Sequence, residues 1–299
     1  MTPGHGNTSY ALNSEYQKML ILKTKLFVEE AITDLYCKSF PTKSLTIADL
    51  GCSSGPNSLL VISEIIEAVD SKCRTLVRTY VRPSKQRTIS VWGRTYAVST
   101  YVPPGIENNK GHVYIAATSP PSVHQAYFTQ FQRDFKLFLS SRSQEITTGG
   151  RMVITRIGRR NLDSFSEECW DGWELLAKSL GDMVSEGHIE EAKLDSFNLP
   201  WYAPSLDEVR AAIQDEKSFH LNLVEIMDDS RMKDMVGDKL NNGPAMARFM
   251  RAVTESMLVS HFGDKILEDL FHKFAEYLNG YLKEHPVYIN LVMTMTKKS

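Results

Sequence analysis

The sequence has few cysteines, no long apolar run and almost no net charge. Its four cysteines form no CxxC pair, which argues against a disulfide framework and a thiolate zinc site. No apolar stretch could span a bilayer, and the N-terminus has no basic segment followed by an apolar one, so we expect neither a secretory signal nor a membrane partner. A net charge of −2 gives no reason to expect a nucleic-acid partner. These absences predict a globular cytoplasmic protein.

One internal stretch lacks acidic residues altogether. There is no Asp or Glu between Ser71 and Ile106, a stretch that contains the basic residues Lys72, Arg74, Arg78, Arg82, Lys85, Arg87 and Arg94. A basic run of this kind is more often a solvated surface than a site for phosphate or nucleic acid.

The 299 residues, 42 % of them hydrophobic, can bury a large core. Apolar periodicity predicts helices at 15–37, 58–69, 122–147, 169–187, 205–215, 245–259 and 263–282. Strand-like patterns occupy 44–51, 112–119, 149–157, 218–227 and 286–298, and residues 88–102 could add two short strands around Gly93. The alternation up to residue 160 predicts a mostly parallel sheet covered by helices, and the helices that follow predict a cap.

The segment "IADLGCSSGPN", residues 47–57, is a strand that ends in a glycine turn and leads into a helix. Glycines at this point let the backbone turn sharply and let a ligand approach the open carboxyl edge of the sheet. The pattern is neither the dinucleotide motif GxGxxG nor a P-loop with its lysine, so an oxidoreductase is disfavoured. Asp49 would repel a pyrophosphate but could pair with the amino group of S-adenosylmethionine. A tight turn without a ligand remains the alternative.

Several long motifs resemble the plant SABATH methyltransferase family, whose members methylate salicylate, benzoate, jasmonate or theobromine precursors. They are "GNTSYALNSEYQ", "ADLGCSSGPNSLL", "NKGHVYIAATSPPSVHQAY", "FLSSRSQEI", "GGRMVITRIGRR", "WELLAKSL", "KLDSFNLPWY", "MRAVTES" and "HFGDKILEDLF", in the family's order. The resemblance implies an α/β fold with a Rossmann-like methyltransferase sheet, mostly parallel with an antiparallel last strand, under a helical cap. It assigns 1–160, with 216–228 and 261–299, to the cofactor-binding core, and 161–215 and 229–260 to the cap that forms the acceptor pocket.

The resemblance also implies a reaction and a set of site residues. The reaction is methyl transfer from S-adenosylmethionine to a carboxylate of a small acid or, in the theobromine branch, to a ring nitrogen of a xanthine alkaloid. The cofactor residues would be Tyr10, Ser14, Asp49, Gly51, Cys52 and Asn57. Gln17 would donate to the substrate carboxylate, and the acceptor pocket would be lined by Tyr101, Ile157, Gly172, Trp173, Met250, Val253 and Tyr288. Relatives are often homodimers.

Two further features concern catalysis and metal binding. A carboxylate is already ionised at neutral pH, so positioning suffices and we assign no catalytic acid or base, whereas a ring nitrogen would need a base. Some relatives hold Mg²⁺ at positions that correspond to Asn109, Asp195, Phe197 and Asn198, and hard oxygen ligands suit this ion. A capped turn before Pro200 explains "DSFN" equally well.

The resemblance fails between residues 74 and 102. An acidic residue at the end of the second strand usually binds the ribose of such a cofactor, and this chain has none there. The family's carboxylate-clamping tryptophan is also missing, although Trp92 is a conceivable substitute. Two hypotheses therefore stay open: an active carboxyl methyltransferase, and a catalytically impaired relative that keeps the fold as a binding protein.

Overall fold

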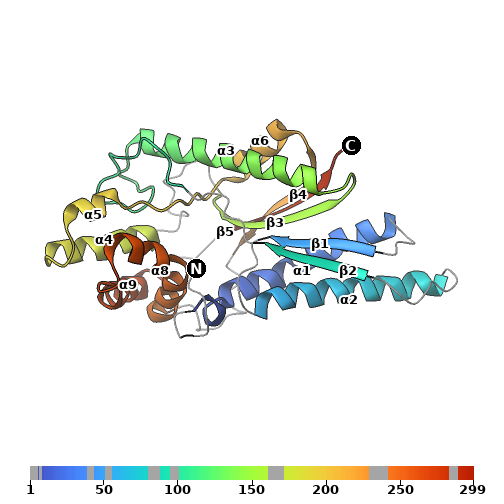
Figure 1. The fold of residues 1–299 in the computed structure, drawn as a ribbon, viewed down its shortest axis with the longest axis horizontal. Helices are drawn as coiled ribbons and strands as arrows, with labels where there is room; N and C mark the ends of the chain where they lie inside the picture. Colours follow the sequence, from blue (N-terminus) through green and yellow to red (C-terminus); the bar gives the residue numbers. More distant parts are fainter. Residues whose placement is uncertain are drawn as a thin grey trace.

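The structure is a computed structural model that describes residues 6, 9–38, 44–50, 56–79, 88–94, 101–160, 172–228, 242–282 and 289–299. Its helical elements are η1 (Tyr10–Leu12), α1 (Glu15–Lys38), α2 (Pro56–Thr79), α3 (Pro121–Glu145), α4 (Gly172–Ser185), α5 (Glu191–Ser196), α6 (Leu206–Glu216), α8 (Gly243–Phe262) and α9 (Leu267–Tyr281). Its strands are β1 (Ser44–Leu50), β2 (Thr88–Arg94), β3 (Arg151–Gly158), β4 (Phe219–Asp228) and β5 (Ile289–Lys297). Figure 1 shows their arrangement.

The described strands form two sheets where the sequence predicts one. β1 and β2 pair in parallel along all their residues, with Asp49 opposite Gly93 and Leu50 opposite Arg94. The second sheet has the order β3-β5-β4, and β5 is antiparallel to both neighbours. The antiparallel last strand is therefore confirmed. β3 and β4 run in the same direction because each is antiparallel to β5.

Helix α1 connects the two sheets. On one side, Ile32 and Tyr36 of α1 share a small buried cluster with Ile65 and Val69 of α2, against which partly buried side chains of β1 pack. On the other side, Asp34 lies 3.4 Å from the guanidinium of Arg151 in β3. α1 and α2 lie side by side (Figure 1), and an ion pair between Lys25 and Glu64 joins them.

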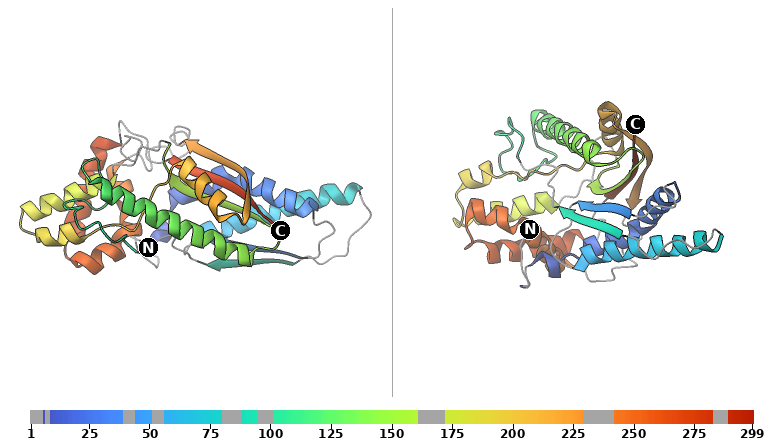
Figure 2. Two further views of the ribbon diagram at one scale, coloured as in Figure 1. Left: turned by 90° about the horizontal axis from the view of Figure 1, so that it is seen from above. Right: turned by 45° about the vertical axis from the view of Figure 1, so that its right-hand side comes forward.

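The opposite face of the second sheet is covered by α3 and α6, as Figures 1 and 2 show. Phe131, Phe135 and Leu139 of α3 recur at a spacing of four, which places them on one helix face. They pack with apolar residues of α6 and with the sheet side chains Met152, Leu291, Met293 and Met295. α6 begins at a capping box in which Ser205 and Glu208 satisfy each other's backbone N–H groups.

Helices α4, α5, α8 and α9 form a separate group at the other end of the molecule (Figure 1). α9 packs on α8 and α4, whereas α6 packs on α3 and β4. The domain division expected from the sequence therefore needs adjustment at both helices, since it assigns α9 to the core and α6 to the cap. Among the described residues, no helix combines the length and the apolar character that crossing a membrane requires.

The predicted strand at 112–119 is wrong. Residues 101–120 contain turns and irregular backbone, although Val113–Ala116 are buried. The backbone groups of this segment form hydrogen bonds with side chains and with one distant backbone group, and not with a neighbouring strand. Asn109 donates to the Tyr114 carbonyl, and Ser119 accepts from the Ala116 N–H. The Leu199 N–H donates to the Val113 carbonyl. The apolar pattern predicts a strand because these residues are buried, but their backbone has no strand to pair with.

Candidate functional site

Several of the predicted site residues lie in or near the first turn of α1. Ser14 precedes the helix and is buried, and both its carbonyl and its hydroxyl oxygen lie 3.1 Å from the side-chain nitrogen of Asn57, at the start of α2. Two predicted cofactor residues that are far apart in the sequence thus contact each other. Tyr10 lies just upstream in η1, where burial raises the pKa of its hydroxyl to about 12, so the group stays neutral at physiological pH.

Asp49 lies next to the carboxyl end of β1 and is partly buried. Burial raises the pKa of its carboxyl group, and within the described part of the chain its side chain has neither a hydrogen bond nor an ion pair. A desolvated carboxylate without a partner is unfavourable until a cation neutralises it. Asp49 therefore fits a cationic ligand such as S-adenosylmethionine. Gly51 and Cys52 lie outside the described residues.

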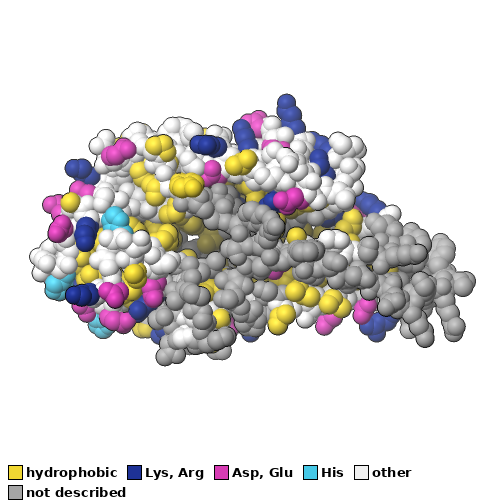
Figure 3. All heavy atoms as spheres, in the orientation of Figure 1, with side chains coloured by type: hydrophobic (Ala, Val, Ile, Leu, Met, Phe, Trp, Pro, Cys, Tyr) yellow, Lys and Arg dark blue, Asp and Glu magenta, His cyan; other side chains and the backbone are white. Residues whose placement is uncertain are grey.

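The predicted acceptor residues come together from three separate elements. Trp173 on α4 and Met250 on α8 are buried members of the largest apolar cluster, and Ile157 on β3 and Val253 on α8 pack against it. Gly172, the first residue of α4, is also buried. Figure 3 shows a hollow in this face of the molecule, bordered by hydrophobic side chains near α4 and α8. Tyr288 lies outside the described residues, and Tyr101 is 75 % exposed, away from this cluster.

Sequence reasoning missed several residues of the same cluster. Trp201 stacks edge-on against Trp173, with ring centroids 5.5 Å apart, and against Tyr114 at 4.9 Å. Tyr16 on α1 packs against Phe249 with ring centroids 5.8 Å apart. The aromatic content of "FNLPWYAP" was the available signal for Trp201, but nothing in the pattern showed which ring faces the cluster.

A buried pair of basic residues at the end of β3 lies behind the cluster. Arg159 is 2 % exposed and forms an ion pair with Glu208 at 2.5 Å, while its neighbour Tyr202 also donates to Glu208. The Arg156 guanidinium stacks over the Phe131 ring at 4.9 Å, and burial lowers its pKa to about 10. These groups tie β3 to α6 and α3.

The four predicted metal ligands also lie close together. The Asn109 amide donates to Asn198 Oδ1 at 2.8 Å and accepts from the Ser119 hydroxyl at 2.6 Å, and Asp195 Oδ1 accepts from the Gly111 N–H at 2.9 Å. Phe197 connects Asp195 and Asn198 along the chain and is buried. Protein donors reach Oδ1 of Asn109, Asn198 and Asp195, so these side chains form a hydrogen-bond network, and its oxygen donor set is of the kind that suits Mg²⁺.

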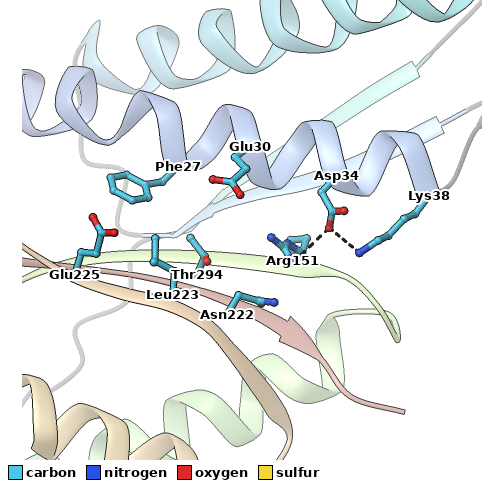
Figure 4. Close-up of a pocket in the computed structure, with 9 residues that line it drawn as sticks. All are labelled: Phe27, Glu30, Asp34, Lys38, Arg151, Asn222, Leu223, Glu225 and Thr294. Carbon is cyan, nitrogen blue, oxygen red and sulfur yellow. Dashed lines mark hydrogen bonds and ion pairs between the residues drawn. The ribbon is translucent and has the colours of Figure 1, made fainter.

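A separate cavity of about 500 Å³ lies between α1 and the sheet β3-β5-β4. Figure 4 shows it with the ion pairs of Asp34 to Lys38 and Arg151 at one end and Phe27, Glu30 and Glu225 at the other. None of the predicted site residues lines it. It therefore belongs to neither the cofactor nor the acceptor region.

The chain matches known proteins along most of its length. The family described as "SAM dependent carboxyl methyltransferase" matches residues 1–86 and 98–298. A probable jasmonic acid carboxyl methyltransferase 2 from Theobroma cacao is 39 % identical over 365 aligned residues, and a salicylate carboxymethyltransferase from Clarkia breweri is 39 % identical over 350. Each alignment covers 100 % of this chain and 98 % of the relative.

A solved structure shares the fold. A loganic acid methyltransferase with SAH superposes with a TM-score of 0.85 and 28 % identity, and the match covers 100 % of this chain and 99 % of that one. The match shows a Rossmann-like methyltransferase fold. The same comparisons also locate a difference, because both sequence alignments are longer than the 299 residues of this chain and the family match omits residues 87–97. The relatives therefore carry positions that this chain lacks.

The matched residues include every predicted cofactor and acceptor position. Family membership thus rests on almost the whole chain and not on the glycine turn alone. The chain belongs to the SABATH family of S-adenosylmethionine-dependent carboxyl methyltransferases.

Proposed function

We propose that this chain methylates the carboxylate of a small organic acid such as salicylate, benzoate or jasmonate. The observation that carries the proposal is the convergence of Ile157, Trp173, Met250 and Val253 on one apolar cluster next to the first turn of α1. Such a cluster suits the ring or alkyl body of a small acid. Relatives that cover nearly the same length are named for jasmonic and salicylic acid, which supports this class of acceptor.

The proposed reaction needs positioning more than proton transfer. S-adenosylmethionine, when bound, supplies a methyl group on a positively charged sulfur. A carboxylate oxygen of the acid forms the new bond to the methyl carbon while the electron pair of the carbon–sulfur bond goes to sulfur. Both the acid and the donor carry the required charge at neutral pH, so no side chain has to move a proton.

Each assigned residue then has a positioning role. Asp49 provides the negative charge for the donor's amino group, and Gln17 donates a hydrogen bond to the acid's carboxylate. Trp173 and Met250 hold the apolar body of the acid and exclude water, which strengthens the electrostatic interactions within the site. This division of roles favours a carboxylate acceptor over a xanthine nitrogen, because the latter would need a base that has not been assigned.

A second candidate is a relative that retains acid binding but methylates slowly or not at all. It is favoured by one observation: β2 occupies the position of a second parallel strand beside β1, yet it carries no acidic residue and lies entirely within residues 87–97, which the family match omits. A charge-assisted hydrogen bond contributes roughly 1.5–3 kcal/mol. Its loss should weaken cofactor binding about tenfold to a hundredfold.

Calorimetry and an assay together test both candidates. We would titrate the purified chain with S-adenosylmethionine and with each acid, and then measure methyl transfer to salicylate, benzoate, jasmonate, indole-3-acetate and a xanthine. Methyl ester formation supports the first candidate. Acid binding without ester formation supports the second, and methylation of the xanthine alone would contradict both.

Three further expectations accompany this proposal. We propose that the chain forms a homodimer in the cytoplasm and that a Mg²⁺ ion held at Asn109, Asp195, Phe197 and Asn198 would have a structural or modulatory role, because methyl transfer to a carboxylate needs positioning alone. Light scattering of the purified chain, fractionation of the source cells and an assay with a chelator test these expectations. An activity lost with chelator and restored by Mg²⁺ would show that the network opens to admit the ion.

A further inference from the structure

Asn290 on β5 is a fully buried polar residue with one unused hydrogen-bonding atom. Its exposed fraction is 0 %, and its side-chain nitrogen donates to the Tyr16 hydroxyl at 2.7 Å. Its side-chain oxygen Oδ1 has no hydrogen-bond donor among the residues that the structure describes. A buried carbonyl oxygen without a donor is rare in folded proteins because desolvation leaves it uncompensated.

The position of Asn290 connects it to the acceptor cluster. It lies directly opposite Ile157 on β3, and cross-strand neighbours of this kind share one face of the sheet. Ile157 packs on the cluster that contains Trp173 and Met250, and Tyr16 belongs to the same cluster. Asn290 is therefore held between Tyr16 and Ile157, at the side of the acceptor cluster formed by the sheet.

A second buried acceptor atom occurs next to Tyr16 in the sequence. Gln17 is assigned to the acid's carboxylate as a donor through its nitrogen, and its own oxygen Oε1 is also buried without a partner among the described residues. The acceptor region thus offers two carbonyl oxygens that need donors. An ionised carboxylate has no proton to give, so a ligand can donate to these oxygens only through another group, such as a hydroxyl.

We propose that Asn290 Oδ1 accepts a hydrogen bond from a hydroxyl group of the methyl acceptor, which makes Asn290 a specificity-determining residue that favours hydroxy acids over their unhydroxylated analogues. This inference rests on the proposed function. The physical basis is that a site with a buried unpaired acceptor rejects an analogue that cannot fill it. Tyr16 holds the amide in place, because it binds the nitrogen and leaves the oxygen available.

The test compares benzoate with its 2-, 3- and 4-hydroxy derivatives, which differ from it by one hydroxyl group at three positions. We expect at least one derivative to exceed benzoate about tenfold in kcat/KM, the factor that one such hydrogen bond supplies. In Asn290→Leu this preference should disappear while benzoate itself is still methylated. Binding of each acid in the presence of S-adenosylhomocysteine, measured by calorimetry, gives the same comparison without turnover.

Tyr16→Phe is the matched control, since it removes the partner of the Asn290 nitrogen but keeps Oδ1. It should reduce the affinity for all four acids and keep the preference for the hydroxy acid. If Asn290→Leu does not fold, the double variant Tyr16→Phe with Asn290→Leu removes both polar partners and leaves an apolar contact.

The outcomes separate this inference from the proposed function. Methylation or binding of benzoate and all three derivatives to the same extent overturns the role of Asn290 and leaves the proposed function intact. A preference that survives in Asn290→Leu also overturns it. Binding of none of the acids overturns the proposed function and the inference with it.

Discussion

The acceptor region and the cofactor region of this chain differ in how much of each site the described residues form. The acceptor region draws on α1, β3, α4 and α8, whose apolar side chains form one cluster. The described cofactor region consists of the two-stranded sheet β1-β2, the small buried cluster that α1 and α2 form against β1, and the contact between Asn57 and Ser14. The contrast shows that a chain can retain the packing that shapes one ligand site while it lacks part of another.

Strand β2 makes the difference concrete. Its backbone pairs with β1 along the full length of both strands, so β2 supplies the hydrogen bonds expected of a second strand beside β1. Its carboxyl end, however, presents the sequence Trp-Gly-Arg opposite Ala48, Asp49 and Leu50, where a ribose-binding acid is expected. Backbone pairing tolerates almost any sequence, whereas ligand binding requires a particular side chain. This chain therefore keeps the strand pairing but lacks the acidic side chain that binds the ribose.

The largest effect is expected from Trp173→Ala. This side chain is 7 % exposed, and its removal should lower the free energy of unfolding by about 3–5 kcal/mol, as for other buried tryptophans. Methyl transfer should fall strongly while the affinity for S-adenosylmethionine, measured by calorimetry on folded protein, changes little. Leu137→Ala provides the control, because that exposed side chain on α3 should alter stability by less than about 0.5 kcal/mol. Equal loss of transfer and of cofactor affinity would contradict the assignment of Trp173 to the acceptor.

The next effect comes from supplying what the cofactor region lacks. We would replace residues 87–97, which the family match omits, by the segment that aligns there in the Theobroma cacao relative. If the missing acid accounts for the difference between the two regions, the affinity for S-adenosylmethionine should rise about tenfold to a hundredfold. The ranking of acids should stay the same. A graft that folds without improving cofactor affinity would place the weakness elsewhere.

A smaller and more specific effect is expected from Asp49→Asn. Loss of the charge opposite the donor's amino group should weaken cofactor binding about tenfold, the lower end for a partly exposed charged pair. Because burial raises the pKa of Asp49, its carboxyl group favours the folded state only while protonated, and this contribution is lost as pH rises through the raised pKa. The asparagine variant should therefore gain stability over the natural chain as the pH rises above about 4, the ordinary pKa of an aspartate.

Denaturant unfolding at several pH values would show this trend, with the exposed Asp70→Asn as control. A variant that is less stable at neutral pH would mean that Asp49 has a stabilising partner, and the argument for a cationic ligand would fail.

Sequence patterns predicted the helices and strands far better than the tertiary contacts and the strand pairing among them. Helices such as α4 and α9 carry strong 3.6-residue periodicity, and their predicted and observed ranges agree closely. The segment 112–119 has the same apolar character as a strand but is satisfied by Asn109 and Ser119, side chains whose role depends on tertiary contacts. Similarly, no local pattern could show that β1 and β3 belong to different sheets, because strand pairing joins residues far apart in the sequence.

The candidate site residues show the same difference between local motifs and long-range contacts. The family motifs predicted roles for Trp173, Met250 and Asp49, whereas they gave no sign of Asn290, for which we propose a contact to the acceptor, or of its partner Tyr16, because the hydrogen bond between these two joins the two ends of the chain. A lone asparagine in an apolar strand reads as a minor irregularity in the sequence. Only the structure shows that it is fully buried with one oxygen unused.

The smallest effect tests the contact that links the two regions. Asn57 donates from α2 to Ser14 at the start of α1, so it connects the segment after the glycine turn to the helix that carries Gln17. Asn57→Ala should cost about 1 kcal/mol of stability, the usual value for such hydrogen bonds, measured by denaturant unfolding. Since the same contact positions residues on both sides, KM for the acid and the dissociation constant of the cofactor should rise together. Gln125→Ala, on the surface of α3, is the control. If only KM for the acid or only the dissociation constant of the cofactor changed, the acceptor region and the cofactor region would be positioned independently of each other.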